Sequence, residues 1–295
     1  MSPELKLPLS VGTVLISIGI GGLVVWAAIR EREASLRCTP GLVAKGPRCC
    51  GEGQRLLGDT CVDAPTDCPS NMRRVSRAVR VGCVAPAERL QIPGGRLELG
   101  PSDWEAQGVV DARVIEVPAF SIDAYEVTAQ RWNGCVARGA CKGKLDEEPG
   151  RPVTDLTPTQ AGDLCRADGG RLPSSDEWLF AAAGVQGRKF PWGNTGLVCR
   201  RAVFGRVTGP CGSNARGPEL SGTMPDGATP EGVYDLSGNV AEWTREADGS
   251  YVARGGSFRS RGAAELKSWS LERLEDSGSP EGFRAPHIGF RCVYP

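Results

Sequence analysis

The residues whose types and spacing could do chemistry are concentrated between positions 234 and 260, in the sequence YDLSGNVAEWTREADGSYVARGGSFRS. Two carboxylates, Asp235 and Glu242, flank Gly238-Asn239, a pair that tolerates the positive φ of a tight turn. Carboxylates together with turn carbonyls are oxygen ligands that Ca²⁺ takes readily. The spacing therefore predicts a calcium site made by Asp235, Glu242 and the carbonyls of Gly238 and Val240, unless Asp235 only caps the turn and Glu242 is exposed.

The second half of this stretch predicts the wall of a binding groove. After a bend at 255–256 come Ser257, Arg259 and Ser260, which bring hydroxyl and guanidinium groups to one short segment. A basic, oxygen-lined groove suits an acidic glycan, a peptide or an anionic polymer. The alternative is that Arg259 and Arg261 belong to an ordinary solvated surface.

His287 is the only histidine in the chain. Metal centres built from two or three imidazoles are therefore excluded within a single chain. A lone histidine is more often a hydrogen-bonding wall residue than a metal ligand, so we expect His287 to line the groove.

Twelve cysteines without any Cys-x-x-Cys spacing predict a disulfide framework formed in an oxidising compartment. Cys135 and Cys141 are spaced for a local disulfide, and Cys199 and Cys211 are placed to tie a long irregular loop at 196–230. Residues 31–90 contain no Phe, Trp or Tyr, so disulfides rather than a large core must hold this region. Its six cysteines allow fifteen pairings, all of which stay open: Cys38, Cys49, Cys50, Cys61, Cys68 and Cys83.

The N-terminal segment predicts membrane attachment. Residues 7–29 carry no charge and are long enough to cross a bilayer core, which favours an uncleaved transmembrane signal anchor over residues 1–30. The alternative is a cleaved signal peptide, whose apolar core is usually shorter. Arg30, Arg32 and Arg37 favour a cytoplasmic C-terminal side, whereas the cysteines favour an extracytoplasmic one. We give the cysteines more weight and expect a single-pass protein of the cell membrane with its C-terminal domain in the periplasm or at the cell surface.

The elements that position the candidate residues are expected to be short. Alternating apolar residues at 92–99 and 114–127 predict strands, and Thr128 is the expected N-cap of a helix that ends near Gly139. Thr157 and Ser174 each begin a capping box and predict two more helices. The apolar end of the chain, 278–295, predicts a terminal strand.

The chain is thus divided into an anchor at 1–30, a cysteine-rich region at 31–90 and a main domain at 91–295. The cysteine-rich region is interpreted as a spacer, with a ligand-binding knob as the alternative. The chain has 35 basic and 35 acidic residues, so its net charge is zero. It therefore has no overall positive electrostatic potential of the kind that attracts nucleic acid.

Seven motifs of the main domain resemble those of the formylglycine-generating-enzyme, or sulfatase-modifying-factor, family. They occur in the order IPGG-x-LELG, F-x-ID-x-YEVT, GGRLPSSDEW, FPWGN, G-x-YDLSGNVAEW, RGGSF and GFRC across residues 91–292. The resemblance implies an α+β fold related to C-type lectins, with little regular secondary structure. It also implies bound calcium at the matched turn and a disulfide between Cys165 and Cys292.

Catalytic relatives oxidise a cysteine of sulfatases to formylglycine with copper(I) held by two thiols, and other relatives are nonheme iron oxidases. The two thiol positions of the family match Ser260 and Glu265 in this chain, so a copper site is not expected here. We therefore expect a membrane-anchored, extracytoplasmic, non-catalytic binding or structural module, whose partner is a cell-envelope protein, a peptide or a glycan. The alternative is an oxidoreductase of the same family acting on a protein or small thiol substrate.

Overall fold

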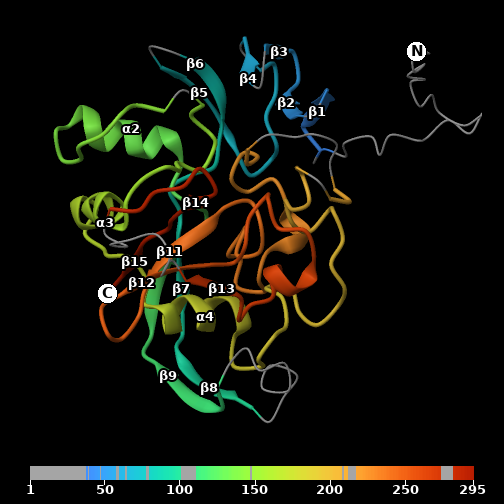
Figure 1. The fold of residues 1–295 in the computed structure, drawn as a ribbon. Helices are drawn as coiled ribbons and strands as arrows, with labels where there is room; N and C mark the ends of the chain where they lie inside the picture. Colours follow the sequence, from blue (N-terminus) through green and yellow to red (C-terminus); the bar gives the residue numbers. More distant parts are fainter. Residues whose placement is uncertain are drawn as a thin grey trace, which may run out of the picture. The chain divides into compact units, whose positions relative to one another are not determined.

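The strands of this protein are short because glycine and proline interrupt the chain at close intervals. The computed structural model describes residues 38–295 apart from 39, 47, 58–59, 64, 78–79, 101–110, 147, 208, 212–216 and 274–281. All of these residues belong to one compact unit, Ala34–Pro295 (Figure 1). The anchor predicted over residues 1–30 lies outside the described residues. Within the described part, no helix has the length and apolarity needed to cross a membrane.

Three hairpins make up the cysteine-rich region. Each is antiparallel: β1 (Leu42–Lys45) with β2 (Arg48–Gly51), β3 (Arg55–Leu57) with β4 (Thr60–Val62), and β5 (Arg73–Arg77) with β6 (Arg80–Val84). The six cysteines pair as Cys38–Cys49, Cys50–Cys61 and Cys68–Cys83. Cys49 and Cys50 are neighbours on β2 and point to opposite faces, which explains why they bond to different partners.

The polar side chains of Arg48 and Asn71 connect the cysteine-rich region to the main domain. The buried Arg48 pairs with Glu148 at 3.5 Å, and its Nη2 also donates to the carbonyl of Pro218 at 3.4 Å. Asn71 Nδ2 donates to the carbonyl of Gly222 at 2.8 Å. The hairpins therefore hold the segment 218–222, whose opposite side meets the candidate site described below.

In the part of the main domain that the structure describes, the strands form two small sheets and a hairpin. One sheet has the order β15-β10-β7, the other has the order β13-β12-β11-β14, and β8 pairs with β9. In both sheets a strand from near the C-terminus lies beside strands from earlier in the chain (Figure 1). The strand bounds are β7 (Arg89–Ile92), β8 (Gly95–Leu99), β9 (Arg113–Val117), β10 (Phe120–Asp123), β11 (Ala241–Arg245), β12 (Tyr251–Arg254), β13 (Leu271–Arg273), β14 (Ile288–Gly289) and β15 (Val293–Tyr294).

The three α-helices of the described residues begin where the sequence predicts them to begin. They are α2 (Ala129–Ala137), α3 (Pro158–Ala167) and α4 (Ser175–Ala183). Thr157 and Ser174 form complete capping boxes at the starts of α3 and α4, as predicted. Thr128 precedes α2, but its side chain makes no cap hydrogen bond. Among the described residues of segment 196–230, the only helix is a short 3₁₀-helix at Pro225–Gly227. Further along the chain, another 3₁₀-helix spans Ala263–Leu266.

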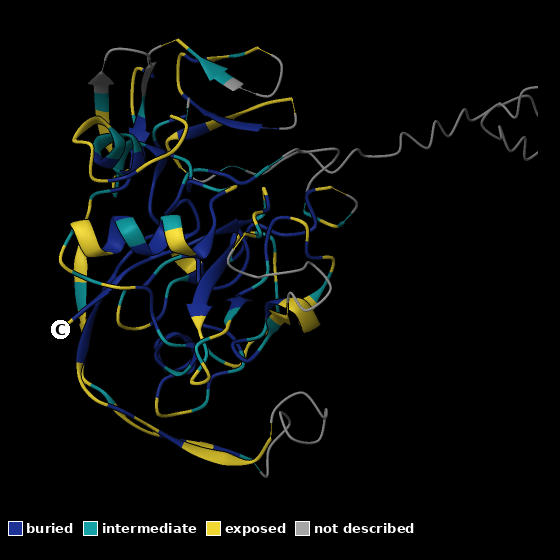
Figure 2. Cartoon of the chain, turned by 60° about the vertical axis from the view of Figure 1, so that its left-hand side comes forward, coloured by how far each residue is buried: buried dark blue, intermediate teal, exposed yellow. Residues whose placement is uncertain are grey.

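The core is formed by large aromatic side chains from different elements. Trp132 of α2, Trp178 of α4, Trp243 of β11 and Trp269 are all almost fully buried. Figure 2 shows that burial is concentrated in the main domain, whereas the β8–β9 hairpin carries many exposed residues. Burying an aromatic side chain is among the largest stabilising contributions in a domain, so these residues fix how the helices lie on the sheets.

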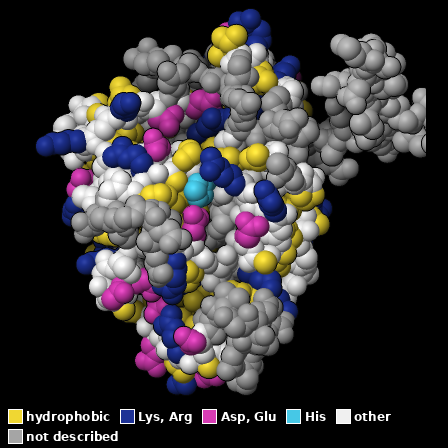
Figure 3. Space-filling view, viewed as in Figure 1, with side chains coloured by type: hydrophobic (Ala, Val, Ile, Leu, Met, Phe, Trp, Pro, Cys, Tyr) yellow, Lys and Arg dark blue, Asp and Glu magenta, His cyan; other side chains and the backbone are white. Residues whose placement is uncertain are grey.

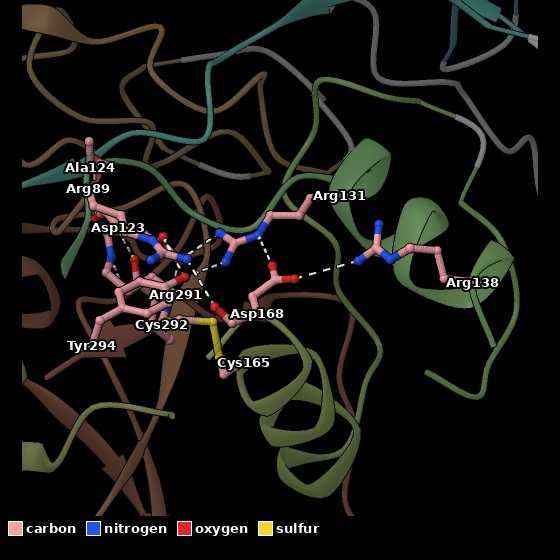
Figure 4. Close-up of polar contacts among 11 residues, drawn as sticks. Arg89, Asp123, Ala124, Arg131, Arg138, Cys165, Asp168, Arg291, Cys292 and Tyr294 are labelled. Atoms are coloured by element: carbon pink, nitrogen blue, oxygen red, sulfur yellow. Dashed lines mark hydrogen bonds and ion pairs between the residues drawn. A yellow bond between two sulfur atoms is a disulfide. The ribbon is translucent and has the colours of Figure 1, made fainter. Parts of the chain in front are cut away.

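The three disulfides expected for the main domain form in the structure: Cys135–Cys141, Cys165–Cys292 and Cys199–Cys211. The bond between Cys165 and Cys292 joins α3 to the C-terminal segment. Beside it, Asp123 accepts hydrogen bonds from Arg131 Nη1, the backbone N–H of Cys292 and the hydroxyl of Tyr294 (Figure 4). The end of the chain is thus bonded to β10, α2 and α3 together.

A buried ion pair lies between the two sheets. Arg291 donates from Nε and Nη2 to the two carboxylate oxygens of Glu242, each at 2.7 Å, and both side chains are fully buried. Arg291 also donates to the carbonyls of Asp123, Ala124 and Tyr234. Its five N–H groups therefore all have acceptors, which offsets the cost of burying the charge.

We predict that Arg291→Met destabilises the fold by about 3–5 kcal/mol, because it leaves the carboxylate of Glu242 buried without a counter-charge. The control is Arg171→Met. Arg171 also donates two hydrogen bonds of 2.7 Å to one carboxylate, that of Glu177, but the Arg171 side chain is exposed. An exposed pair contributes about 1 kcal/mol or less. Urea unfolding of both variants measures the difference, and equal losses of stability would contradict the central role of Arg291.

Candidate functional site

The predicted turn lies at the centre of the candidate site. Gly238 and Asn239 adopt φ of 88° and 57°, and the N–H of Asn239 donates to the carbonyl of Val203 at 2.8 Å. A Cβ at Gly238 would lie 2.6 Å from that carbonyl oxygen, so only glycine fits there. The turn leads directly into β11, which carries Glu242.

A third carboxylate, Glu126, joins the two that the sequence predicts. Glu126 Oε2 accepts hydrogen bonds from Asn239 Nδ2 at 2.7 Å and from Ser221 Oγ at 2.9 Å, and Oε1 accepts from the N–H of Val240 at 3.2 Å. Asp235 Oδ2 accepts from the N–H of Gly222 at 2.6 Å. The turn is therefore connected by buried hydrogen bonds to the segment that the cysteine-rich hairpins hold.

Burial shifts the protonation of these acids. Burial and the nearby charges of Asp235 and Glu242 raise the pKa of Glu126 well above its ordinary value. Burial also raises the pKa of Asp235 from 3.8 to about 6, against the opposing effects of the Gly222 N–H and of Arg291. Both shifts favour the protonated acids, which lowers the negative charge that Arg291 has to balance.

One of the predicted calcium ligands, Glu242, already has hydrogen-bond partners for both of its carboxylate oxygens. Both oxygens of Glu242 accept hydrogen bonds from Arg291, and Oε2 also accepts one from Trp178 Nε1 at 2.7 Å. Val240 presents its N–H to Glu126. Among the described residues, no group of three or more His, Cys, Asp or Glu side chains is placed to hold a metal ion. The described residues thus form a hydrogen-bonded cluster in which Arg291 pairs with Glu242, and calcium at Asp235, Gly238, Val240 and Glu242 stays a prediction.

Ser257 and Ser260, predicted to line the groove, form a tight turn with each other. The N–H of Ser257 donates to Ser260 Oγ at 3.0 Å, and the N–H of Ser260 donates to the carbonyl of Ser257 at 2.9 Å. Ser257 Oγ accepts from the N–H of Arg259 at 3.2 Å. Both serines are buried, so their hydroxyls hold the turn together, while Arg259 is exposed beside them.

Glu265, at the second family thiol position, lies close to Ser260. Its carboxylate accepts from the N–H of Arg261 at 2.9 Å, and its carbonyl and Ser260 Oγ both lie next to Gly256. All twelve cysteines are engaged in the six disulfides, so no thiol is free. The structure thus brings the two positions together without placing sulfur at either of them.

His287 lies at the surface beside an acidic side chain. Its Nε2 is 3.3 Å from Glu272 Oε2, while Nδ1 is buried and makes no hydrogen bond within the described part of the chain. The hydrogen bond from His287 lowers the pKa of Glu272, and the charge of Arg259 lowers it further. Figure 3 shows the single histidine among acidic, basic and apolar side chains on one face. Arg259, Glu272 and His287 therefore form a mixed-charge surface, which we call the groove triad.

Residues 78–295 match the model of the sulfatase-modifying factor enzyme 1-like domain. The chain belongs to this family. The match begins within the predicted cysteine-rich region and covers the whole of the main domain. The resemblance inferred from the seven sequence motifs is therefore confirmed.

The curated relatives include both inactive and catalytic proteins. The chain is 33% identical over 154 residues to the inactive C-alpha-formylglycine-generating enzyme 2 of Mus musculus, which covers 48% of each chain. It is 25% identical over 292 residues to the formylglycine-generating enzyme of Bos taurus, covering 79% of this chain and 77% of that one. It is 26% identical over 223 residues to hercynine oxygenase of Mycolicibacterium smegmatis, and the match covers 59% of this chain and 50% of that one. The chain spans about half the length of the inactive enzyme 2 and of hercynine oxygenase.

Solved structures with the same fold include PvdO from Pseudomonas aeruginosa and CarF. CarF superimposes with a TM-score of 0.52 at 21% identity, covering 71% of this chain and 98% of CarF. PvdO superimposes with a TM-score of 0.55 at 21% identity, covering 72% of this chain and 94% of PvdO. These matches support the fold with few helices and many small sheets, as predicted.

Three residues of the site were not assigned a role from the sequence. Arg291 stands alone in the apolar run IGFRCV, and a single charge in such a run indicates a buried partner. Glu126 occupies a similar position in AYEVT. Glu272 has no comparable signal, because its segment is polar on both sides.

We predict that the stability of the wild type relative to Asp235→Asn falls as the pH rises from about 4 to about 6 and is constant above that range. Because the folded-state pKa of Asp235 is about 6 and the reference value is 3.8, the folded state binds the extra proton in this window. The expected change is on the order of 1–3 kcal/mol. Urea unfolding at a series of pH values measures it, and a constant difference would show that Asp235 is not buried as described.

Proposed function

We propose that this family domain binds a partner at the groove triad and does not oxidise it. The observation that carries the proposal is the pair Ser260 and Glu265 at the family thiol positions, together with the engagement of every cysteine in a disulfide. The similarity to a relative described as inactive supports the same conclusion.

The chemistry of copper explains why these two positions decide the function. Copper(I) is a soft ion that prefers thiolate ligands, and a serine hydroxyl or a carboxylate is a poor substitute. Ser260 Oγ also lacks the ability of a thiol to form a mixed disulfide with a substrate cysteine. The disulfides leave no other thiol available to take over the role.

The groove triad favours a polar, charged partner. Arg259 and Glu272 are exposed with opposite charges, and His287, which has a buried ring nitrogen, lies against Glu272. Such a surface can both donate hydrogen bonds to a ligand and accept hydrogen bonds from it. Glycans and peptides carry both kinds of group. We therefore propose a cell-envelope protein, a peptide or a glycan as the partner, and no nucleic acid.

We further propose that the protein is held in the cell membrane by residues 1–30, with the main domain outside the cytoplasm. The uncharged run at 7–29 supports the anchor, and the six disulfides support an oxidising compartment.

An oxidoreductase activity is the second candidate, because curated relatives include the formylglycine-generating enzyme and hercynine oxygenase. It would need ligands other than the family thiols. Oxygen consumption by the full chain, with copper or iron added and a sulfatase-motif cysteine peptide as substrate, distinguishes the two candidates. Turnover above the rate in buffer would favour the enzyme, and its absence would reject that substrate.

We predict that the full chain binds no stoichiometric copper(I), whereas the double variant Ser260→Cys, Glu265→Cys gains a site. The reason is that the two positions lie together and only sulfur is missing. Titration against a chromogenic copper(I) chelator measures the stoichiometry. One copper(I) per wild-type chain would overturn the proposed function.

We predict that the full chain stays with the membrane fraction after a carbonate wash. Deletion of residues 1–30 is expected to move the protein to the soluble fraction, because the only long uncharged run is then removed. A full chain released by the wash, or a deletion variant that still sediments with the membrane, would contradict the anchor.

A further inference from the structure

A pocket lies at the irregular loop that follows the FPWGN motif, and none of its lining residues belongs to the groove triad. Its volume is about 740 Å³, which is within the range of small-ligand sites. Leu197, Phe204 and Met224 supply apolar lining, and Arg200, Arg201 and Arg206 supply charge. No acidic side chain lines the pocket within the described residues. The lining thus combines an apolar surface with positive charge only.

The wall of this pocket is fixed by bonds to the rest of the domain. The disulfide Cys199–Cys211 closes the loop, and both of its cysteines line the pocket. The N–H of Gly205 donates to the carbonyl of Ser260 at 2.7 Å, and the N–H of Arg206 donates to the carbonyl of Phe258 at 3.1 Å. The pocket is therefore preformed, and it shares this wall with the segment that carries the two serines of the groove.

Two of the three arginines are already neutralised by carboxylates. Arg206 and Glu219 are both buried and pair at 2.5 Å. Arg200 pairs with Asp226 at 3.3 Å, and its side chain is largely exposed. Neither guanidinium requires an external anion.

Arg201 differs, because no carboxylate pairs with it within the described part of the chain. Its Nη1 donates to two neutral oxygens, Thr195 Oγ1 at 2.6 Å and the carbonyl of Gly196 at 3.0 Å. Its guanidinium carbon lies 5.7 Å from the centre of the Trp192 ring. Its Nε is buried and has no hydrogen-bond partner there. These contacts hold the guanidinium in place but leave its Nε–Nη2 edge without an acceptor.

A buried N–H without an acceptor is costly, and a guanidinium edge is shaped to bind both oxygens of a carboxylate. The apolar side chains next to Arg201 would meanwhile exclude water from the rest of a ligand. The site is therefore complementary to a carboxylate carried on an apolar body.

We propose that this pocket binds such a carboxylate, and that its source is the free C-terminus of a polypeptide that ends in apolar residues. The terminal carboxylate pairs with the open edge of Arg201, and the last apolar side chains pack against Leu197, Phe204 and Met224. This site is independent of the proposed function, because it uses none of the residues of the groove triad.

Calorimetry on the full chain in mild detergent tests the proposal with three probes. These are the peptide Gly-Ser-Gly-Phe-Leu with a free C-terminus, the same peptide as its C-terminal amide, and octanoate as a free organic acid. We expect the free acid peptide to bind at least tenfold more tightly than the amide. Arg201→Gln should abolish this preference, whereas the control Arg200→Gln should change the affinity less than threefold.

A second pair of variants guards against a folding defect in Arg201→Gln. Val198 lines the pocket and is 44% exposed, so either charge is tolerated there. Val198→Glu should weaken the binding of the acid peptide at least tenfold by repulsion, and Val198→Lys should retain it. Binding of octanoate that depends on Arg201, without binding of the peptide, would support the site but assign it to small acids. Equal binding of acid and amide, no binding of any probe, or equal effects of the two arginine variants would overturn the proposal.

Discussion

The pairing of Arg291 with Glu242 is the interaction on which the rest of the structure depends. Five acceptors surround one buried guanidinium: the two oxygens of Glu242 and the carbonyls of Asp123, Ala124 and Tyr234. These acceptors come from the end of β10, the start of the candidate turn and β11, which are distant in sequence. A buried charge is stable only when its donors are satisfied, so each of these segments must keep its place. Cys292, which directly follows Arg291 in the sequence, is held by its disulfide to Cys165.

This arrangement explains how a family fold can persist without family chemistry. Arg291 pairs with one of the buried acids, Glu242, and the bend at Ser257 and Ser260 is closed by its own hydrogen bonds. The segment around the two family thiol positions is therefore held by hydroxyl and backbone contacts that do not depend on a metal. What remains exposed there is the groove triad, and beyond the shared wall lies the pocket with Arg201. Both surfaces are suited to recognition.

Local features of this fold follow from the sequence, and long-range ones do not. The capping boxes at Thr157 and Ser174 are formed by residues three positions apart, and the turn at Gly238 follows from its backbone freedom. The sequence places Asp235 and Glu242 beside the turn, but it contains no information that Glu242 pairs with Arg291, which is 49 residues further along. The pairings in the cysteine-rich region likewise depend on which hairpins form, and the contact between Glu272 and His287 depends on how β13 is placed.

The inference that this domain binds without oxidising depends most directly on the state of its sulfur atoms. Free thiols can be counted by unfolding the native protein without a reductant, labelling it with a maleimide and measuring the intact mass. Six disulfides account for all twelve cysteines, so no label should be added. Two labels per chain, on cysteines that can reach Ser260 and Glu265, would contradict the proposed function and restore a route to copper chemistry.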